Sequence, residues 1–224
     1  MPRILCPVLV GRESELAQLD GAVDAAQHGR GGVLFVTGPA GVGKSRLVAE
    51  AIARAGARHI ATIAGRCVPS ATPVPYRPLA EALLGAPQSA LLRDTRELAP
   101  YRAALSWMVP AWRDPTTPLA PESPVVVAEA LVRTLEAMAA HAAVVLLVED
   151  AQWSDPETLH AVEYLADHAH TTHVLCLCTL RDDEPSEARA LVERLDSRRA
   201  ADVVRLSPLT AAQVSEMAGR SLGT

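Results

Sequence analysis

Two residue types are missing or nearly missing from this sequence of 224 residues. Asparagine is absent, and Lys44 is the single lysine among 21 basic residues. The usual guanine-reading motif, NKxD, needs an asparagine, so its absence disfavours guanine nucleotides and leaves adenine as the expected base. Because every other basic side chain is arginine, the lone lysine marks a position that needs a compact ammonium group rather than a planar guanidinium group.

The sequence also lacks an excess of positive charge, a long apolar run and closely paired cysteines. A formal net charge of −5 offers little to neutralise backbone phosphates, so we expect no direct nucleic-acid contact by this segment. The longest apolar stretch, 142–148, is far shorter than the roughly 20 residues of a membrane-spanning helix. The four cysteines show no CxxC spacing, and the N-terminus has no signal-peptide pattern. We therefore expect a soluble, cytoplasmic protein without a membrane partner.

Aromatic residues are scarce, so Ala, Val and Leu must build most of the core, as in packed α/β layers. Apolar runs predict strands at 33–37, 58–63, 143–148, 174–180 and 202–206. Helical spacing predicts helices at 11–28, 45–55, 79–84, 125–140, from 154 to about 168, at 185–195 and after Thr210. The proline-rich stretch 110–124 is interpreted as an ordered loop between helices. This alternation predicts an α/β fold with a five-stranded parallel sheet and helices on both faces.

A glycine-rich segment, GPAGVGKS at 38–45, separates the first predicted strand from the next helix. It matches GxxxxGK[ST] in the strand–loop–helix context that a phosphate-binding loop (P-loop) requires. Its backbone N–H groups and the helix N-terminus favour an anion, Lys44 is expected to reach the β and γ phosphates, and the Ser45 hydroxyl to hold Mg²⁺. The expected nucleotide contacts here are Pro39, Ala40, Gly41, Val42, Gly43, Lys44, Ser45 and Arg46. A plain glycine-rich turn with an exposed lysine is the disfavoured alternative.

A second motif is acidic and ends the predicted strand 143–148. Glu149 and Asp150 have the form of a Walker B segment, in which carboxylates serve Mg²⁺ and the attacking water. By position Glu149 takes the metal role and Asp150 the water role, but the order reverses the commoner Asp-then-Glu pair, so this division stays open. The alternative is that both acids merely end the strand and cap the next helix.

Arg181 follows the predicted strand 174–180, and the carboxyl ends of parallel strands line the ligand crevice of an open sheet. Its guanidinium group is a candidate sensor of the γ phosphate. The rival interpretation is a surface arginine paired with Asp182 or Asp183.

Together these segments resemble the STAND class of P-loop ATPases, and within it the ATPase modules of large LuxR-type transcriptional regulators and related adenylate-cyclase-linked proteins. The resemblance rests on LVGRE at 9–13, GPAGVGKS at 38–45, GRC at 65–67 with PYRP at 75–78, EDAQWSD at 149–155, LRDDE at 180–184 and LSPL at 206–209. It covers nearly the whole chain.

The resemblance implies a switch: an ADP-bound closed monomer exchanges ADP for ATP after an inducer binds elsewhere, and then self-associates. It places Val10, Gly11 and Arg12 against the adenine and Arg181 at the γ phosphate. It also implies that Pro208 opens a helical lid, which predicts an ATPase domain at 1–207 and the start of a truncated lid at 208–224. Further domains for sensing and DNA reading are expected C-terminal to this segment.

The leading hypothesis is therefore an ATP-binding switch, with ATP or ADP and Mg²⁺ as cofactors and slow hydrolysis of ATP to ADP and phosphate. Lys44, Glu149, Asp150 and Arg181 would carry that hydrolysis. Two alternatives stay open: a phosphotransferase acting on a small molecule, and a nucleotide-binding scaffold without hydrolysis.

Overall fold

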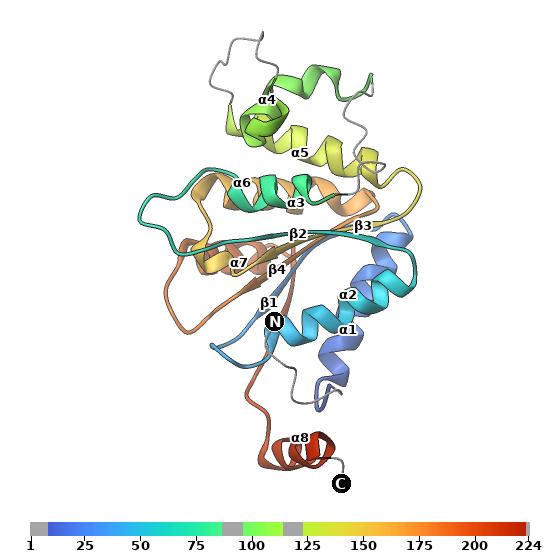
Figure 1. The fold of residues 1–224 in the computed structure, drawn as a ribbon, viewed down its shortest axis with the longest axis vertical. Coiled ribbons are helices and arrows are strands. Elements are labelled where there is room, and N and C mark those ends of the chain that lie inside the picture. Colours follow the sequence, from blue (N-terminus) through green and yellow to red (C-terminus); the bar gives the residue numbers. More distant parts are fainter. Residues whose placement is uncertain (1–8, 87–95, 114–122, 223–224) are drawn as a thin grey trace.

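The computed structural model describes residues 9–86, 96–113 and 123–222. These residues form one sheet of five strands in the order β2-β3-β4-β1-β5 (Figure 1). The strands are β1 (Gly32–Thr37), β2 (Ala61–Arg66), β3 (Val144–Glu149), β4 (Val174–Leu180) and β5 (Asp202–Arg205). All four neighbouring pairs are parallel, so every strand delivers its carboxyl end to the same edge. The predicted α/β fold is confirmed.

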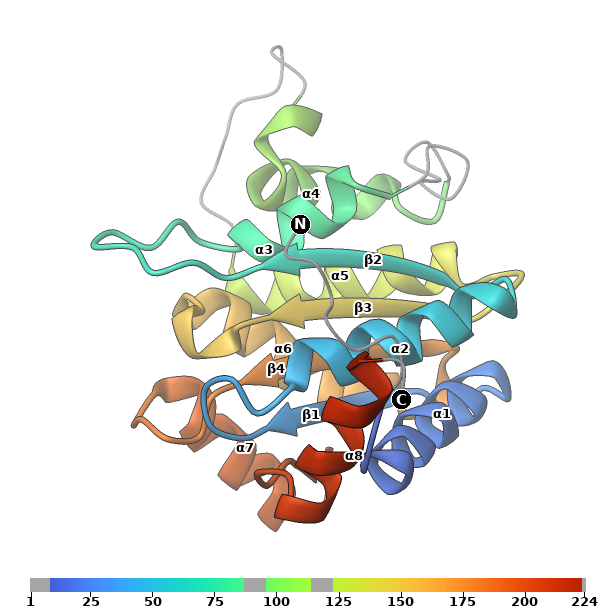
Figure 2. The ribbon, with the colours of Figure 1, turned by 60° about the horizontal axis from the view of Figure 1, so that its bottom comes forward.

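Helices cover both faces of this sheet (Figures 1 and 2). The α-helices are α1 (Glu13–Gln27), α2 (Lys44–Ala57), α3 (Arg77–Leu84), α4 (Arg102–Met108), α5 (Pro124–Met138), α6 (Pro156–His168), α7 (Glu187–Ser197) and α8 (Ala211–Leu222). Short 3₁₀ turns occur at Ala99–Tyr101, Pro110–Trp112, Ala151–Trp153 and Ala169–Thr171. None of the helices in the described ranges is both long and apolar enough to cross a membrane.

The two faces have separate cores because side chains alternate along each strand. Phe35 of β1 packs in the core beneath α3 to α7, whereas Leu34 and Val36 pack in the core beneath α1 and α2. Each fully buried Leu, Val or Phe contributes about 1.5–3 kcal/mol relative to an exposed one. α1 and α2 lie on the same face, and the chain crosses to the other face after β2. The loop from β1 to α2 follows the carboxyl end of β1, between β4 and β5 in the sheet, and the carboxyl ends of the strands line the usual ligand crevice of such sheets.

The predicted second strand, 58–63, begins three residues before β2 does. Arg58 and His59 close α2 instead: His59 adopts φ 60°, and the N–H of Ile60 donates to the Ala55 carbonyl oxygen at 3.1 Å. The strand then runs through Arg66 because that residue still pairs with Glu149 of β3. The sequence analysis also predicts no helix for 102–108, where α4 lies, and the middle of the stretch 110–124 falls outside the described residues.

α8 lies apart from the two cores. It begins as expected from Thr210, whose hydroxyl accepts the N–H of Gln213 at 3.3 Å. None of its described side chains is fully buried, and Figure 1 shows it set off from the sheet. α8 is therefore weakly anchored by apolar packing.

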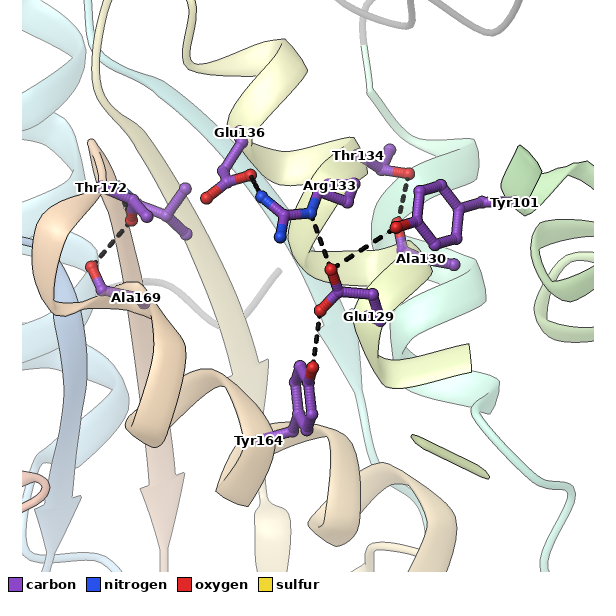
Figure 3. A network of polar contacts seen from close by, with 10 residues as sticks. Tyr101, Glu129, Ala130, Arg133, Thr134, Glu136, Tyr164, Ala169 and Thr172 are labelled. Atoms are coloured by element: carbon purple, nitrogen blue, oxygen red, sulfur yellow. Dashed lines mark hydrogen bonds and ion pairs between the residues drawn. The ribbon is translucent and has the colours of Figure 1, made fainter. Parts of the chain in front are cut away.

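A polar network joins α5, α6 and the turn before α4 (Figure 3). The Glu129 carboxylate accepts the Tyr164 hydroxyl at 2.6 Å, the Tyr101 hydroxyl at 3.5 Å and Arg133 Nε at 2.7 Å. Burial opposes ionisation of Glu129, but the hydrogen bonds from Tyr164 and Arg133 outweigh it, so the pKa of Glu129 is lowered. The hydrogen bond to Glu129, with burial, raises the pKa of Tyr164 to about 12.

This network predicts a pH-dependent stability. A carboxylate whose pKa is lower in the folded state stabilises the fold above its unfolded pKa, roughly 4.3 for Glu, and loses that contribution as the pH falls through the folded pKa. We expect Glu129→Gln to lower the free energy of unfolding by about 1 kcal/mol at neutral pH, with the difference shrinking below about pH 4. Urea unfolding from pH 3 to pH 8 measures it. Glu193→Gln, in the exposed pair with Arg189, is the matched control, and a difference independent of pH would contradict the assignment.

Candidate functional site

The loop between β1 and α2 curls because three glycines take positive φ angles. Gly38, Gly41 and Gly43 have φ values of 151°, 73° and 107°, which side chains rarely allow. Gly43 is the N-cap of α2, so the helix begins at Lys44, and a Cβ on Gly38 would lie 2.7 Å from the Leu206 carbonyl oxygen. The loop therefore presents backbone N–H groups and the positive end of α2 to one place.

Lys44 lies inside this loop rather than on the surface. It is 8% exposed, and its Nζ donates to the carbonyl oxygens of Gly38 at 2.6 Å and Pro39 at 2.9 Å. Burial lowers the pKa of Lys44, while the nearby carboxylates of Asp182 and Asp183 oppose that shift. The disfavoured interpretation of an exposed lysine does not fit this geometry.

Arg12 connects the loop to the C-terminal part of the chain. Its guanidinium group is buried, donates to the carbonyl oxygens of Val42 at 3.3 Å and Ser207 at 2.6 Å, and pairs with Glu15 at 2.9 Å. The neighbouring Gly11 has φ 66°, and a Cβ there would overlap the side chain of Gln213 in α8. The segment 10–12 thus contacts both the phosphate-binding loop and α8.

A cleft of about 650 Å³ opens between these segments. The expected nucleotide contacts that line it are Val10, Arg12, Pro39, Ala40, Gly41, Val42, Gly43, Arg46 and Pro208. Gly11, Lys44 and Ser45 do not line this cleft, although they adjoin residues that do. Sequence reasoning missed Leu9, Leu209, Val214 and Met217, and the apolar spacing of the last two on α8 was the one available signal. Apolar side chains together with the phosphate-binding loop in one cleft suit a molecule with an aromatic base and phosphates.

The acidic end of β3 lies against the end of β2. Asp150 adopts a left-handed conformation with φ 56°, and its N–H donates to the Thr179 hydroxyl at 3.0 Å. Its Oδ2 accepts Arg66 Nη2 at 2.7 Å and Nε at 2.9 Å. Asp150 is thus already engaged by a cation, a contact that the sequence analysis did not predict. Glu149 is half-buried and receives no side-chain hydrogen bond from the described residues.

Arg181 joins the same edge through its backbone, whose N–H donates to Gln152 Oε1 at 3.0 Å. Gln152 Nε2 in turn donates to Asp150 Oδ1 at 3.4 Å. Within the described residues Arg181 forms no ion pair with Asp182 or Asp183, and Asp183 instead accepts the N–H of Ala40 in the phosphate-binding loop at 3.2 Å. The surface-pair interpretation of Arg181 is therefore wrong for these two partners.

The carboxylate that caps α6 fixes the loop beside this edge. Asp155 is 3% exposed, caps α6 by accepting the N–H of Thr158 at 2.8 Å, and also accepts the N–H of Tyr76 at 3.0 Å. Tyr76 is buried with φ 59°. One carboxylate thereby holds α6 and the start of α3 together.

The residues at this edge fit a nucleotide with Mg²⁺. The glycines leave space that a Cβ would fill, and the buried Lys44 ammonium lies beside the loop, where it adds a cation to backbone N–H groups of the kind that bind an anion. The hydroxyl of Ser45 and the carboxylates of Glu149 and Asp150 are hard oxygen donors, the type that Mg²⁺ prefers.

Solved structures with a similar fold include the Aeropyrum pernix ORC2 protein in ADPNP–ADP complexes. That protein is 13% identical with a TM-score of 0.52, and the comparison covers 100% of this chain and 54% of that one. A STAND protein with a tetratricopeptide repeat sensor, PH0952 of Pyrococcus horikoshii, gives 18% identity and a TM-score of 0.49, with 97% and 26% of the two chains covered. At 13% identity the ORC2 structure supports the fold alone.

Among curated proteins, the uncharacterized protein R02095 of Rhizobium meliloti (strain 1021) is 28% identical over 199 residues. The alignment covers 80% of this chain but 19% of that protein, so this chain spans about a fifth of the relative's length. The family model of the AAA ATPase domain matches residues 8–177, which include the phosphate-binding loop and the acidic strand end. Because that match covers well over half of the sequence, the chain belongs to the AAA ATPase domain family and is a nucleotide-binding module.

Proposed function

We propose that this chain is the ATP-binding switch module of a larger signalling or transcriptional regulator of the STAND class, in which the bound nucleotide controls self-association. One observation carries the proposal: the cleft is lined by the phosphate-binding loop on one side and by α8 on the other. A nucleotide in that cleft contacts both the fixed sheet edge and a weakly anchored helix. Binding energy can therefore be converted into a change in the position of α8.

In our proposal the side chain of Arg12 links the phosphate-binding loop to the segment that carries α8. It is hydrogen-bonded to Val42 of the loop and to Ser207 just before Pro208. A shift of the loop around a phosphate is thereby transmitted to the segment that carries α8. The predicted domain boundary after residue 207 would place this link at the junction of an ATPase domain and a helical lid.

Within the site, Lys44 would bind the β and γ phosphates and Arg181 would sense the γ phosphate. Ser45 and Glu149 would hold Mg²⁺, which supplies charge neutralisation at the phosphates, and Asp150 would orient the attacking water. The contact of Arg66 with Asp150 supports slow hydrolysis, because the guanidinium group occupies Oδ2, an atom that would otherwise accept a hydrogen bond from the attacking water. The same contact also favours the scaffold without hydrolysis, for which Asp150→Ala would release phosphate as slowly as wild type.

The comparisons support parts of this proposal. The Aeropyrum pernix ORC2 protein was solved with ADPNP and ADP, and adenine nucleotides are what we propose for this chain. The P. horikoshii STAND protein carries a tetratricopeptide repeat sensor, and the 19% coverage of the R. meliloti relative leaves room for such domains. Sensing and DNA reading, as in LuxR-type regulators, would lie in such additional domains.

The test combines nucleotide identity, turnover and mass. Mass spectrometry of the nucleotide released from purified protein is expected to detect ADP or ATP. Multi-angle light scattering with ADP and then with non-hydrolysable ATP is expected to give a larger mass only with the ATP analogue. Rapid turnover by a monomer would refute the switch, and phosphate transfer to a metabolite rather than to water would favour a phosphotransferase.

Arg66 provides a prediction specific to this site. Arg66→Ala removes both donors to Asp150 Oδ2, so we expect phosphate release at saturating ATP to rise about 3- to 10-fold because Oδ2 is then free to orient the attacking water. Stability should change by less than about 1 kcal/mol because the pair is exposed. Arg189→Ala, which breaks an exposed pair on α7, is the control. A fall in turnover would mean that hydrolysis requires Arg66 itself.

A further inference from the structure

A second cleft of about 690 Å³ lies between α3 and α4, and it shares no lining residue with the nucleotide cleft. One wall is formed by α3 and the residues just before it, and the other by α4 and the turn Pro110–Trp112. Figure 1 places α4 at the end of the molecule opposite α8. The cleft is therefore a separate feature of the fold.

Its walls carry three of the large apolar side chains that are exposed in the described part of the chain. Val74, Leu84 and Trp107 are 59%, 52% and 38% exposed, and all three line the cleft. Leaving this much apolar surface in water is unfavourable at about 25 cal/mol per Å². A concave, mostly apolar surface of this kind is typical of a binding site.

The polar groups at the cleft are unbalanced in charge. Arg77 and Arg113 line it and form no hydrogen bond or ion pair through their side chains with any residue that the structure describes. Glu81 is the one acidic residue among the lining residues, and its Oε2 accepts the N–H of Arg66 at 3.2 Å. Two guanidinium groups without an acidic partner among the described residues, beside an apolar wall, favour an anion, and arginine matches carboxylate and phosphate geometry.

We propose that the cleft between α3 and α4 binds a small molecule that has an aromatic or alkyl body and a carboxylate or phosphate group. The body would pack between Leu84 and Trp107, and the anion would bind Arg77 and Arg113. Two facing walls and this volume suit a small molecule, since ligand pockets usually run about 300–1,000 Å³. A stable protein interface needs roughly 800 Å² on each partner and is seldom confined to one cleft.

The test uses three probes with the full chain: 2-naphthoate, the neutral 2-naphthylmethanol with the same body, and acetate with the same anion. Binding is followed by NMR through the indole N–H of Trp107, assigned with Trp112→Phe and Trp153→Phe, and through the Arg66 amide that donates to Glu81. We expect a saturating shift with 2-naphthoate, at least about tenfold weaker binding of the alcohol, and no shift with acetate.

Matched variants separate the two parts of the proposal. Arg77→Gln combined with Arg113→Gln should remove the preference for naphthoate over the alcohol, whereas Arg30→Gln, at the opposite sheet edge, should keep it. Leu84→Gln should weaken both aromatic probes, and its exposure makes it safe for folding. Equal binding of naphthoate and the alcohol to wild type would overturn the proposal, as would equal, non-saturating shifts of Trp107 and Trp153. A wild-type dimer that Leu84→Gln converts to a monomer would assign the cleft to a second copy and also overturn it.

Discussion

Lys44→Ala is expected to lower the affinity for ATP by at least about 100-fold while the protein stays folded. The Lys44 ammonium donates to Gly38 and Pro39 within the loop, so it is held where a phosphate would accept its hydrogen bonds. Two charge-assisted hydrogen bonds at about 1.5 kcal/mol each correspond to a factor of more than about 100. Isothermal titration with ATP and Mg²⁺ measures the change.

Two further variants show what Lys44 supplies. Lys44→Arg keeps the charge but replaces a point charge with a wide planar group, so it should also bind weakly. Arg30→Ala removes an exposed cation at the opposite edge of the sheet and should bind ATP like wild type. Retention of affinity within about threefold in Lys44→Ala would refute phosphate binding by this residue. Normal binding by Lys44→Arg would show that charge alone is needed.

The parts of the site that could be predicted from the sequence are those that depend on neighbours along the chain. The loop at 38–45 is local: glycines allow its turns, and Lys44 and Ser45 follow at fixed spacing at the start of α2. The cap by Thr210 and the buried positions Leu16, Leu19 and Val23 of α1 are local for the same reason. Local contacts of this kind can be predicted because regular backbone geometry fixes the distances between residues that are close in sequence.

Contacts between distant segments could not be read in this way. Arg12 reaches Ser207 across most of the chain, and Arg66 meets Asp150 because β2 and β3 pair in a particular register. No periodicity in the sequence specifies either partner. The predicted start of β2 is wrong for a different, local reason: Ile60 is apolar enough for a strand, but its N–H donates to the Ala55 carbonyl oxygen and ends α2. The hydrogen bond that ends α2, rather than strand propensity, sets that boundary.

The packing of α3 against β2 depends on Gly65, and Gly65→Ala is expected to destabilise the fold by about 3 kcal/mol or more. A Cβ built there lies 1.7 Å from the Pro78 carbonyl oxygen, and the obstacle is backbone rather than a flexible side chain. α3 would have to move away from β2, although Leu79 and Leu83 of α3 are fully buried in the core. Overpacking a core typically costs about 1–3 kcal/mol. Because the backbone of α3 would have to move here, we expect the cost of Gly65→Ala to lie at the upper end of that range or above it.

Gly21→Ala is the matched control, since Gly21 lies inside α1 and a Cβ there meets nothing within 4 Å. It should stabilise the protein by about 0.5–1 kcal/mol, because alanine favours the helix more than glycine does. Chemical denaturation of both variants gives the two values. If Gly65→Ala still folds, the shift of α3 should move Arg66, and the Arg66 amide should lose the shift caused by its bond to Glu81. Equal stability of Gly65→Ala and wild type would show that α3 is not fixed against β2, and Arg66 would then lack a rigid position from which to hold Asp150.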